Sequence, residues 1–138
     1  MTLRQVMKLD LLSIKDKVAT MVNDAKEETD VKNKLDEIKN SLDELKFQLA
    51  PHKRGNEDKG YKFKDVSGEM EIIKDNIENL QNVGANKYAK AFKKEIEDLE
   101  QEMNNMMEII EVWVEVQKKW IYLESIFVGS EDIRQKLV

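Results

Sequence analysis

The sequence predicts a mainly α protein, an elongated helical bundle with one long C-terminal helix and a β-hairpin insertion. Apolar residues recur every three or four positions along most of the 138 residues, which is the spacing that lines one face of an α-helix. Charged residues make up 37% of the chain, against five glycines and one proline, a balance typical of long solvated helices with few turns. One stretch instead alternates apolar with polar residues, which indicates strands.

The pattern of apolar residues within 1–45 predicts two helices. The first apolar stripe consists of Leu11, Ile14, Val18, Met21 and Ala25, and the second of Val31, Leu35, Ile38, Leu42 and Leu45. Thr29 and Asp30 lie between the stripes and suit the N-cap of a second helix. Two amphipathic helices separated by so short a break favour an antiparallel pair, with one kinked helix as the alternative.

Residues 46–66 predict a β-hairpin. The alternating positions are Phe47 and Leu49 before a polar loop and Tyr61 and Phe63 after it, with Lys62 and Lys64 on the other face. Pro51 forbids continuation of the preceding helix, and Gly55 and Gly60 are the flexible points of the loop. We expect the four apolar side chains to pack against the helices and the two lysines to face water.

Two more helices are predicted after the hairpin. Residues 69–82 form a short one, with Gly84 as its C-cap because glycine tolerates a positive φ. Residues 86–125 are expected to form a long helix of about 60 Å. No glycine or proline lies within it, so we expect no kink. Its apolar positions are Tyr88, Phe92, Ile96, Leu99, Met103, Met106, Ile110, Trp113, Val116, Trp120 and Leu123, and we expect Met103, Met106 and Met107 to fill gaps in the core.

Trp113 and Trp120 lie seven residues apart, so on a helix they fall almost above one another. Bulky aromatic residues overfill the narrow seam of a two-stranded coiled coil, which favours a packing spine with both tryptophans buried. Exposed anchors for a partner surface are the alternative. Residues 130–138 then predict the start of a further, truncated helix, typical of a piece of something larger.

No residue is a candidate for catalysis, cofactor binding or metal binding. The chain has no cysteine and His52 is its single histidine, so we expect no zinc site or histidine-assisted triad and place His52 in a surface loop. The segment from Gly55 to Gly60 lacks the Gly-Lys-Ser/Thr end of a phosphate-binding loop. Acidic pairs such as Glu27 with Glu28 have lysine neighbours and are expected on solvated helix faces.

Charge and hydropathy argue against two classes of partner. Twenty-three basic and 28 acidic residues give a net charge of −5, whereas a nucleic-acid surface needs clustered cations. No apolar run approaches the ~20 residues that span a bilayer, and the N-terminus lacks the apolar core of a secretion signal. We therefore expect a soluble, cytoplasmic chain that binds neither nucleic acid nor membrane.

The C-terminal part of the chain carries a specific order of residue types. The order is Trp113, Val116, Gln117, Trp120, Tyr122, Leu123, Glu124, Ile126, Phe127, Asp132, Ile133 and Leu137. It closely resembles a signature of dynein heavy chains, and helical periodicity alone does not fix residue types at a dozen positions. The run from Leu45 to Lys53 is similar to the same family, so the resemblance covers roughly Leu11 to Leu137. Val138 departs from it, because proline commonly follows the last leucine in that family.

The resemblance implies a function. In dynein heavy chains this segment belongs to the linker, a mechanical lever N-terminal to the AAA ring that transmits ATP-driven ring rearrangement to the tail in microtubule-based motility. It implies a non-catalytic fragment without cofactors. The implied partners are the AAA ring and tail of the same heavy chain, dynein intermediate and light chains through the whole complex, and microtubules only indirectly.

The stretch 124–134 is most similar to axonemal outer-arm heavy chains, which implies a cytoskeletal location in the axoneme of a cilium or flagellum. A free-standing spectrin-like helical scaffold or interaction module is the alternative. It would account for the helices but not for the hairpin or the signature.

Overall fold

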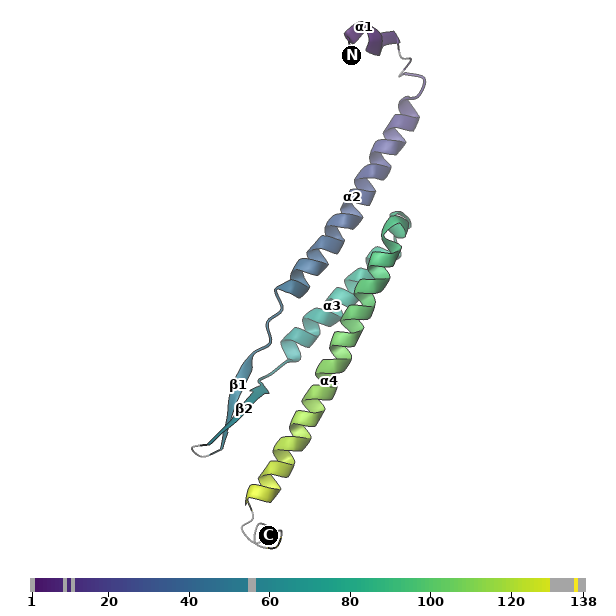
Figure 1. Ribbon diagram of the computed structural model, residues 1–138. Helices are drawn as coiled ribbons and strands as arrows, with labels where there is room; N and C mark the ends of the chain where they lie inside the picture. The colour runs from purple at the N-terminus through teal and green to yellow at the C-terminus, as the bar shows by residue number, and fades with distance from the viewer. Residues whose placement is uncertain (1, 9, 11, 55–56, 130–135, 137–138) are drawn as a thin grey trace.

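The computed structural model describes residues 1–138 apart from 1, 9, 11, 55–56, 130–135 and 137–138. In chain order it contains α1 (Leu3–Lys8), α2 (Lys15–Asp43), β1 (Leu49–Arg54), β2 (Glu57–Phe63), α3 (Ser67–Gly84), the 3₁₀ helix η1 (Lys87–Phe92) and α4 (Lys93–Gly129). Figure 1 shows an elongated molecule in which α2, α3 and α4 run side by side and the hairpin extends beyond the end of α2. The predicted fold class is confirmed.

α2 is one helix of 29 residues, so the predicted antiparallel pair within residues 1–45 is wrong. No glycine or proline occurs before Pro51, and Thr29 lies inside the helix with its hydroxyl donating to the Ala25 carbonyl at 2.8 Å. At 3.6 residues per turn, the first apolar stripe lies about 120° around the helix axis from the second. The helix is therefore continuous although its apolar residues move from one face to another. Read from the sequence alone, such a move looks like the end of one helix and the start of the next.

The core lies where α3 packs between α2 and α4. Its fully buried large side chains are Leu35 of α2, Ile73 and Leu80 of α3, and Met103 of α4. Met106 and Met107 pack against this cluster, which confirms the methionines as core residues. Burying one such side chain contributes about 1.5–3 kcal/mol, so this three-helix region supplies most of the stability of the fold.

α3 contains the predicted helix 69–82 and is longer at both ends. At its start, Asp65 accepts hydrogen bonds from the Ser67 backbone N–H at 3.0 Å and from the Ser67 hydroxyl at 2.6 Å. These bonds stabilise the carboxylate and hold the pKa of Asp65 below its ordinary value of 3.8. The predicted left-handed C-cap at Gly84 is wrong, because the Ala85 N–H bonds to the Gln81 carbonyl and continues the helical pattern past it.

The long helix is preceded by a 3₁₀ segment, where a continuous α-helix had been predicted from residue 86. The Asn86 side chain caps this segment by accepting from the Tyr88 N–H at 2.9 Å, and the Tyr88 hydroxyl donates to Asp24 of α2 at 2.8 Å. α4 then runs for 37 residues, past the predicted end at residue 125. The further helix predicted over 130–138, and with it Val138, lies outside the described residues apart from Lys136.

The hairpin is confirmed. β1 and β2 pair antiparallel, with Leu49 opposite Phe63 and Pro51 opposite Tyr61, and the register is irregular between Pro51 and Lys53. The end of β1 and the start of β2 lie farthest from α3 (Figure 1).

The side chains of the hairpin follow the expected pattern only in part. Phe47 and Phe63 pack against the core cluster, and Lys64 is exposed, as predicted. Leu49 and Tyr61, however, are 57% and 73% exposed, and Lys62 is half-buried. Tyr61 is exposed because it lies two residues farther from α3 than Phe63, whereas Leu49 lies opposite Phe63 and is exposed all the same.

Candidate interaction surface

Among the described residues, no three His, Cys, Asp or Glu side chains come together in a way that could hold a metal ion. None of the helices described is long and apolar enough to cross a membrane. The prominent feature is the junction between the hairpin and the C-terminal half of α4, beside large exposed aromatic side chains. This junction is the candidate surface for contact with further protein.

Two lines of side chains run along the C-terminal half of α4. The half-buried line consists of Val114, Gln117, Ile121 and Glu124, and the exposed line of Trp113, Val116, Trp120, Leu123 and Phe127. They diverge because the apolar positions from Tyr88 to Leu123 recur on average every ~3.5 residues while the helix turns every ~3.6, so the stripe drifts by ~20° per heptad. Over this length the drift carries the tryptophans away from the core-facing side.

Gln117 fastens the end of β2 to α4. Its carboxamide oxygen accepts from the Phe63 backbone N–H at 2.8 Å, and its Nε2 donates to the Phe63 carbonyl at 3.1 Å. The side chain thus occupies the place that a neighbouring strand would take, and it satisfies both backbone groups of the last residue of β2. The position of the hairpin end on the helix is fixed by these two bonds.

Aromatic packing extends this attachment. Phe63 lies between Phe47, with ring centroids 5.8 Å apart, and Trp113, with centroids 5.7 Å apart and rings nearly perpendicular at 71°. Edge-to-face pairs of this kind contribute about 0.5–1.5 kcal/mol beyond their buried area. Trp113 therefore contacts the hairpin with part of its ring while the rest remains exposed.

His52 joins the outer part of the hairpin to α4. Its Nε2 lies 2.6 Å from Oε2 of Glu124, and the two side chains are only 17% and 10% exposed. The expectation of a surface-loop histidine is wrong, because His52 is in β1 and faces the helix. The residue types near His52 carried no signal of this contact, since Glu124 lies 72 positions away in the sequence.

The prediction that Trp113 and Trp120 are buried is wrong for this chain, where they are 55% and 64% exposed. α3 has 18 residues and α4 has 37, so no other described helix reaches this line. With Tyr61 the tryptophans frame a cleft of about 190 Å³ that is also lined by His52 and Lys62. Tryptophan and tyrosine often carry most of the binding energy of an interface, so this cleft can hold an apolar side chain of a partner.

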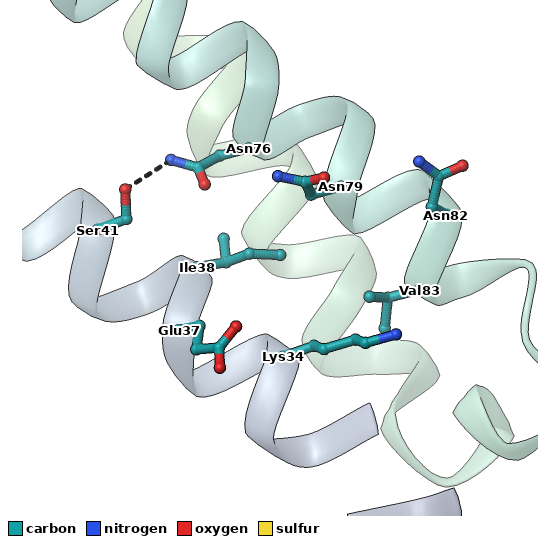
Figure 2. A pocket seen from close by; sticks show the side chains of 8 residues that line it. All are labelled: Lys34, Glu37, Ile38, Ser41, Asn76, Asn79, Asn82 and Val83. Atoms are coloured by element: carbon teal, nitrogen blue, oxygen red, sulfur yellow. Dashed lines mark hydrogen bonds between the residues drawn. The ribbon is translucent and has the colours of Figure 1, made fainter. Parts of the chain in front are cut away.

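A second hollow, of about 450 Å³, lies between α2 and α3 (Figure 2). It is lined by Lys34, Glu37, Ile38 and Ser41 of α2 and by Asn76, Asn79, Asn82 and Val83 of α3. Asn76, only 7% exposed, donates to the Ser41 hydroxyl at 3.0 Å and so joins the two helices. The amides and the single cation and anion give this hollow no concentrated charge, so the smaller aromatic cleft is the stronger candidate for recognition.

The fold and this surface define an elongated helical segment with an aromatic face available for packing against further protein. The family described as dynein heavy chain, N-terminal region 2, matches residues 1–138. The chain belongs to the dynein heavy chain family.

Individual relatives are axonemal and ciliary heavy chains. The chain is 32% identical over 136 residues to the Dynein-1-alpha heavy chain of the flagellar inner arm I1 complex from Chlamydomonas reinhardtii. It is 34% identical over 136 residues to dynein axonemal heavy chain 9 from Homo sapiens, and 32% identical over 137 residues to the ciliary dynein beta chain of Tripneustes gratilla. These alignments cover 99% of this chain and 3% of each relative, so the chain spans about 3% of the length of the relatives it matches.

The similarity to axonemal dynein heavy chains predicted from the sequence is thus confirmed. A flagellar inner-arm chain is among the relatives, so the narrower outer-arm assignment stays a prediction.

Proposed function

We propose that this chain is part of the linker of a dynein heavy chain, a mechanical lever that transmits ATP-driven rearrangement of the AAA ring to the tail in microtubule-based motility. Membership of the family supports a motor-related role. The names of the relatives refer to axonemes, cilia and flagella, and on that basis we assign this chain to the axoneme. Its proposed partners are the ring and tail of its own heavy chain, with intermediate and light chains engaged through the whole complex and microtubules only indirectly.

The observation that carries this proposal is the attachment of the hairpin to an uninterrupted helix. α4 contains no proline, and its single glycine is its last residue. The hairpin contacts α4 at Trp113, Gln117 and Glu124, which span about 16 Å of its C-terminal half. A helix braced in this way resists bending better than one with free sides, and a lever has to transmit force without bending.

The exposed aromatic line supports the same proposal. Trp113, Trp120 and Phe127 lie along one side of α4, where a rigid neighbour could dock and receive the force. In this proposal the chain itself is non-catalytic and works by connecting other parts of the heavy chain. The alternative of a free-standing spectrin-like scaffold is less well supported, because the family match covers residues 1–138.

A kink in α4 tests the lever. Asn104 is exposed on α4 next to the buried Met103, on the N-terminal side of the half that the hairpin braces. Asn104→Pro removes one helical hydrogen bond and clashes with the preceding turn, at a cost of about 3 kcal/mol, whereas Asn104→Ala at the same position favours the helix. In the intact heavy chain we expect the proline variant to keep ring ATPase activity and to lose most of its microtubule gliding speed, with the alanine variant unchanged.

Hydrogen exchange along α4 would show whether the kink forms. Normal gliding by a proline variant whose exchange confirms the kink would exclude α4 as the force-transmitting element.

A further inference from the structure

The N-terminal half of α2 carries an apolar face that the rest of the described chain leaves open. We call Val18, Met21, Val22 and Ala25 the outer stripe; the first three are 43%, 69% and 65% exposed, and Ala25 is exposed as well. Their spacing of i, i+3, i+4 and i+7 is that of a helix face that packs against another helix. Figure 1 shows this half of α2 extending beyond the ends of α3 and α4.

The outer stripe differs from the face that α2 turns toward its neighbours. Asp24 marks the inner side at this level, because it accepts the hydrogen bond of the Tyr88 hydroxyl, and Val31 and Leu35 continue that side into the core. The outer stripe lies about 120° around the axis from these residues. At this level α2 therefore has a polar inner side and an apolar outer side, so contacts within the described part of the chain do not account for the stripe.

The charged residues beside the outer stripe indicate what kind of element covers it. These residues are Lys15 and Lys26 along one edge of the stripe and Glu28 along the other, and Lys32 follows Ala25 two turns later, so the surroundings of the stripe are net positive on a chain of net charge −5. Two antiparallel copies of this chain paired through the stripe would place the edge with Lys15 and Lys26 against the same edge of the other copy. A helix with carboxylates beside its own apolar residues fits instead.

We propose that the outer stripe is the docking site of an amphipathic helix from another part of the same heavy chain, with acidic side chains flanking its apolar face. The relatives are long enough to contain such a helix elsewhere in the polypeptide, because this chain aligns with only 3% of their length. A segment of the same polypeptide also has a high effective concentration at this surface. The inference rests on family membership and on the geometry of α2, so it can fail independently of the lever proposal.

Photo-crosslinking in the intact heavy chain tests the docking site. A benzophenone amino acid is placed at Val22, in the outer stripe, and in a matched protein at Asn23, the next exposed residue, which points to another side of α2. We expect Val22 to crosslink to a helical segment of the same polypeptide that contains Asp or Glu beside its apolar positions. We expect a much lower yield from Asn23, because a probe there points away from the docked helix even when that helix is bound.

Two further measurements fix the partner and its chemistry. A mixture of isotopically light and heavy chains separates crosslinks within one polypeptide from those between two copies. Lys26→Glu should lower the Val22 yield several-fold while Lys26→Arg preserves it, because only the first reverses the border charge. Equal yields from Val22 and Asn23, products joining two polypeptides, or a yield insensitive to Lys26→Glu would each overturn the proposal.

Discussion

Replacing Gln117 tests whether its side chain holds the hairpin on α4. Gln117→Met keeps the length of the side chain and removes both hydrogen bonds to the Phe63 backbone, at 2.8 and 3.1 Å. A net 0.5–1.5 kcal/mol for each bond gives a loss of about 1–3 kcal/mol, and the half-buried position favours the lower part of this range because water can replace some of the interaction. Detachment of the hairpin should then become about 5–30 times more frequent.

Amide hydrogen exchange of Phe63 reports this opening directly, since its N–H is the donor to Gln117. We expect faster exchange at Phe63 in Gln117→Met, and an intermediate rate in Gln117→Glu, which keeps an acceptor for that N–H but loses the donor to the carbonyl. Gln101→Met is the matched control, because Gln101 is an exposed glutamine of the same helix. Unchanged exchange at Phe63 in a folded Gln117→Met protein would refute the assignment.

Three further predictions concern stability, activity and pH. Leu80→Ala should lower the free energy of unfolding by about 2–5 kcal/mol, whereas Trp120→Ala in this chain should cost less than about 1 kcal/mol because its side chain is 64% exposed; denaturant titration of both checks the contrast. The polypeptide should release no phosphate from ATP above a heat-denatured control, since it carries no phosphate-binding loop. The lowered pKa of Asp65 gives a contribution to stability that is present above pH 3.8 and is lost as the pH falls through the folded pKa; Ser67→Ala should raise that pKa in an NMR titration.

Local chemistry was sufficient to predict most of the elements. Pro51 and the change from a helical to an alternating period located the hairpin, and the spacing of Ile73 and Leu80 located α3. These signals depend on neighbours within a few residues, where the geometry of a helix or strand directly constrains the sequence. The continuity of α2 was missed because a change of apolar face and a helix break leave similar patterns over a short window.

Contacts between distant elements could not be predicted in the same way. The pairing of His52 with Glu124 and the bonds of Gln117 to Phe63 depend on where the hairpin lies along α4, which no local pattern fixes. Whether Trp113 and Trp120 are buried depends on how far the neighbouring helices extend. A side chain with the right spacing stays exposed where the neighbouring helices end. Both residues are exposed, as the alternative expectation had it, and their role as anchors for a partner stays a prediction.

The slow drift of the apolar stripe along α4 also sets the path of any helix that covers it. From Ile96 to Leu123 the stripe runs for about 40 Å, and a partner lying parallel to α4 would lose contact with it within a few turns. A helix that follows the whole stripe has to cross α4 at roughly 20° and wind around it with a left-handed sense. The spacing of the apolar residues along α4 thus specifies the handedness of the superhelix into which it can assemble.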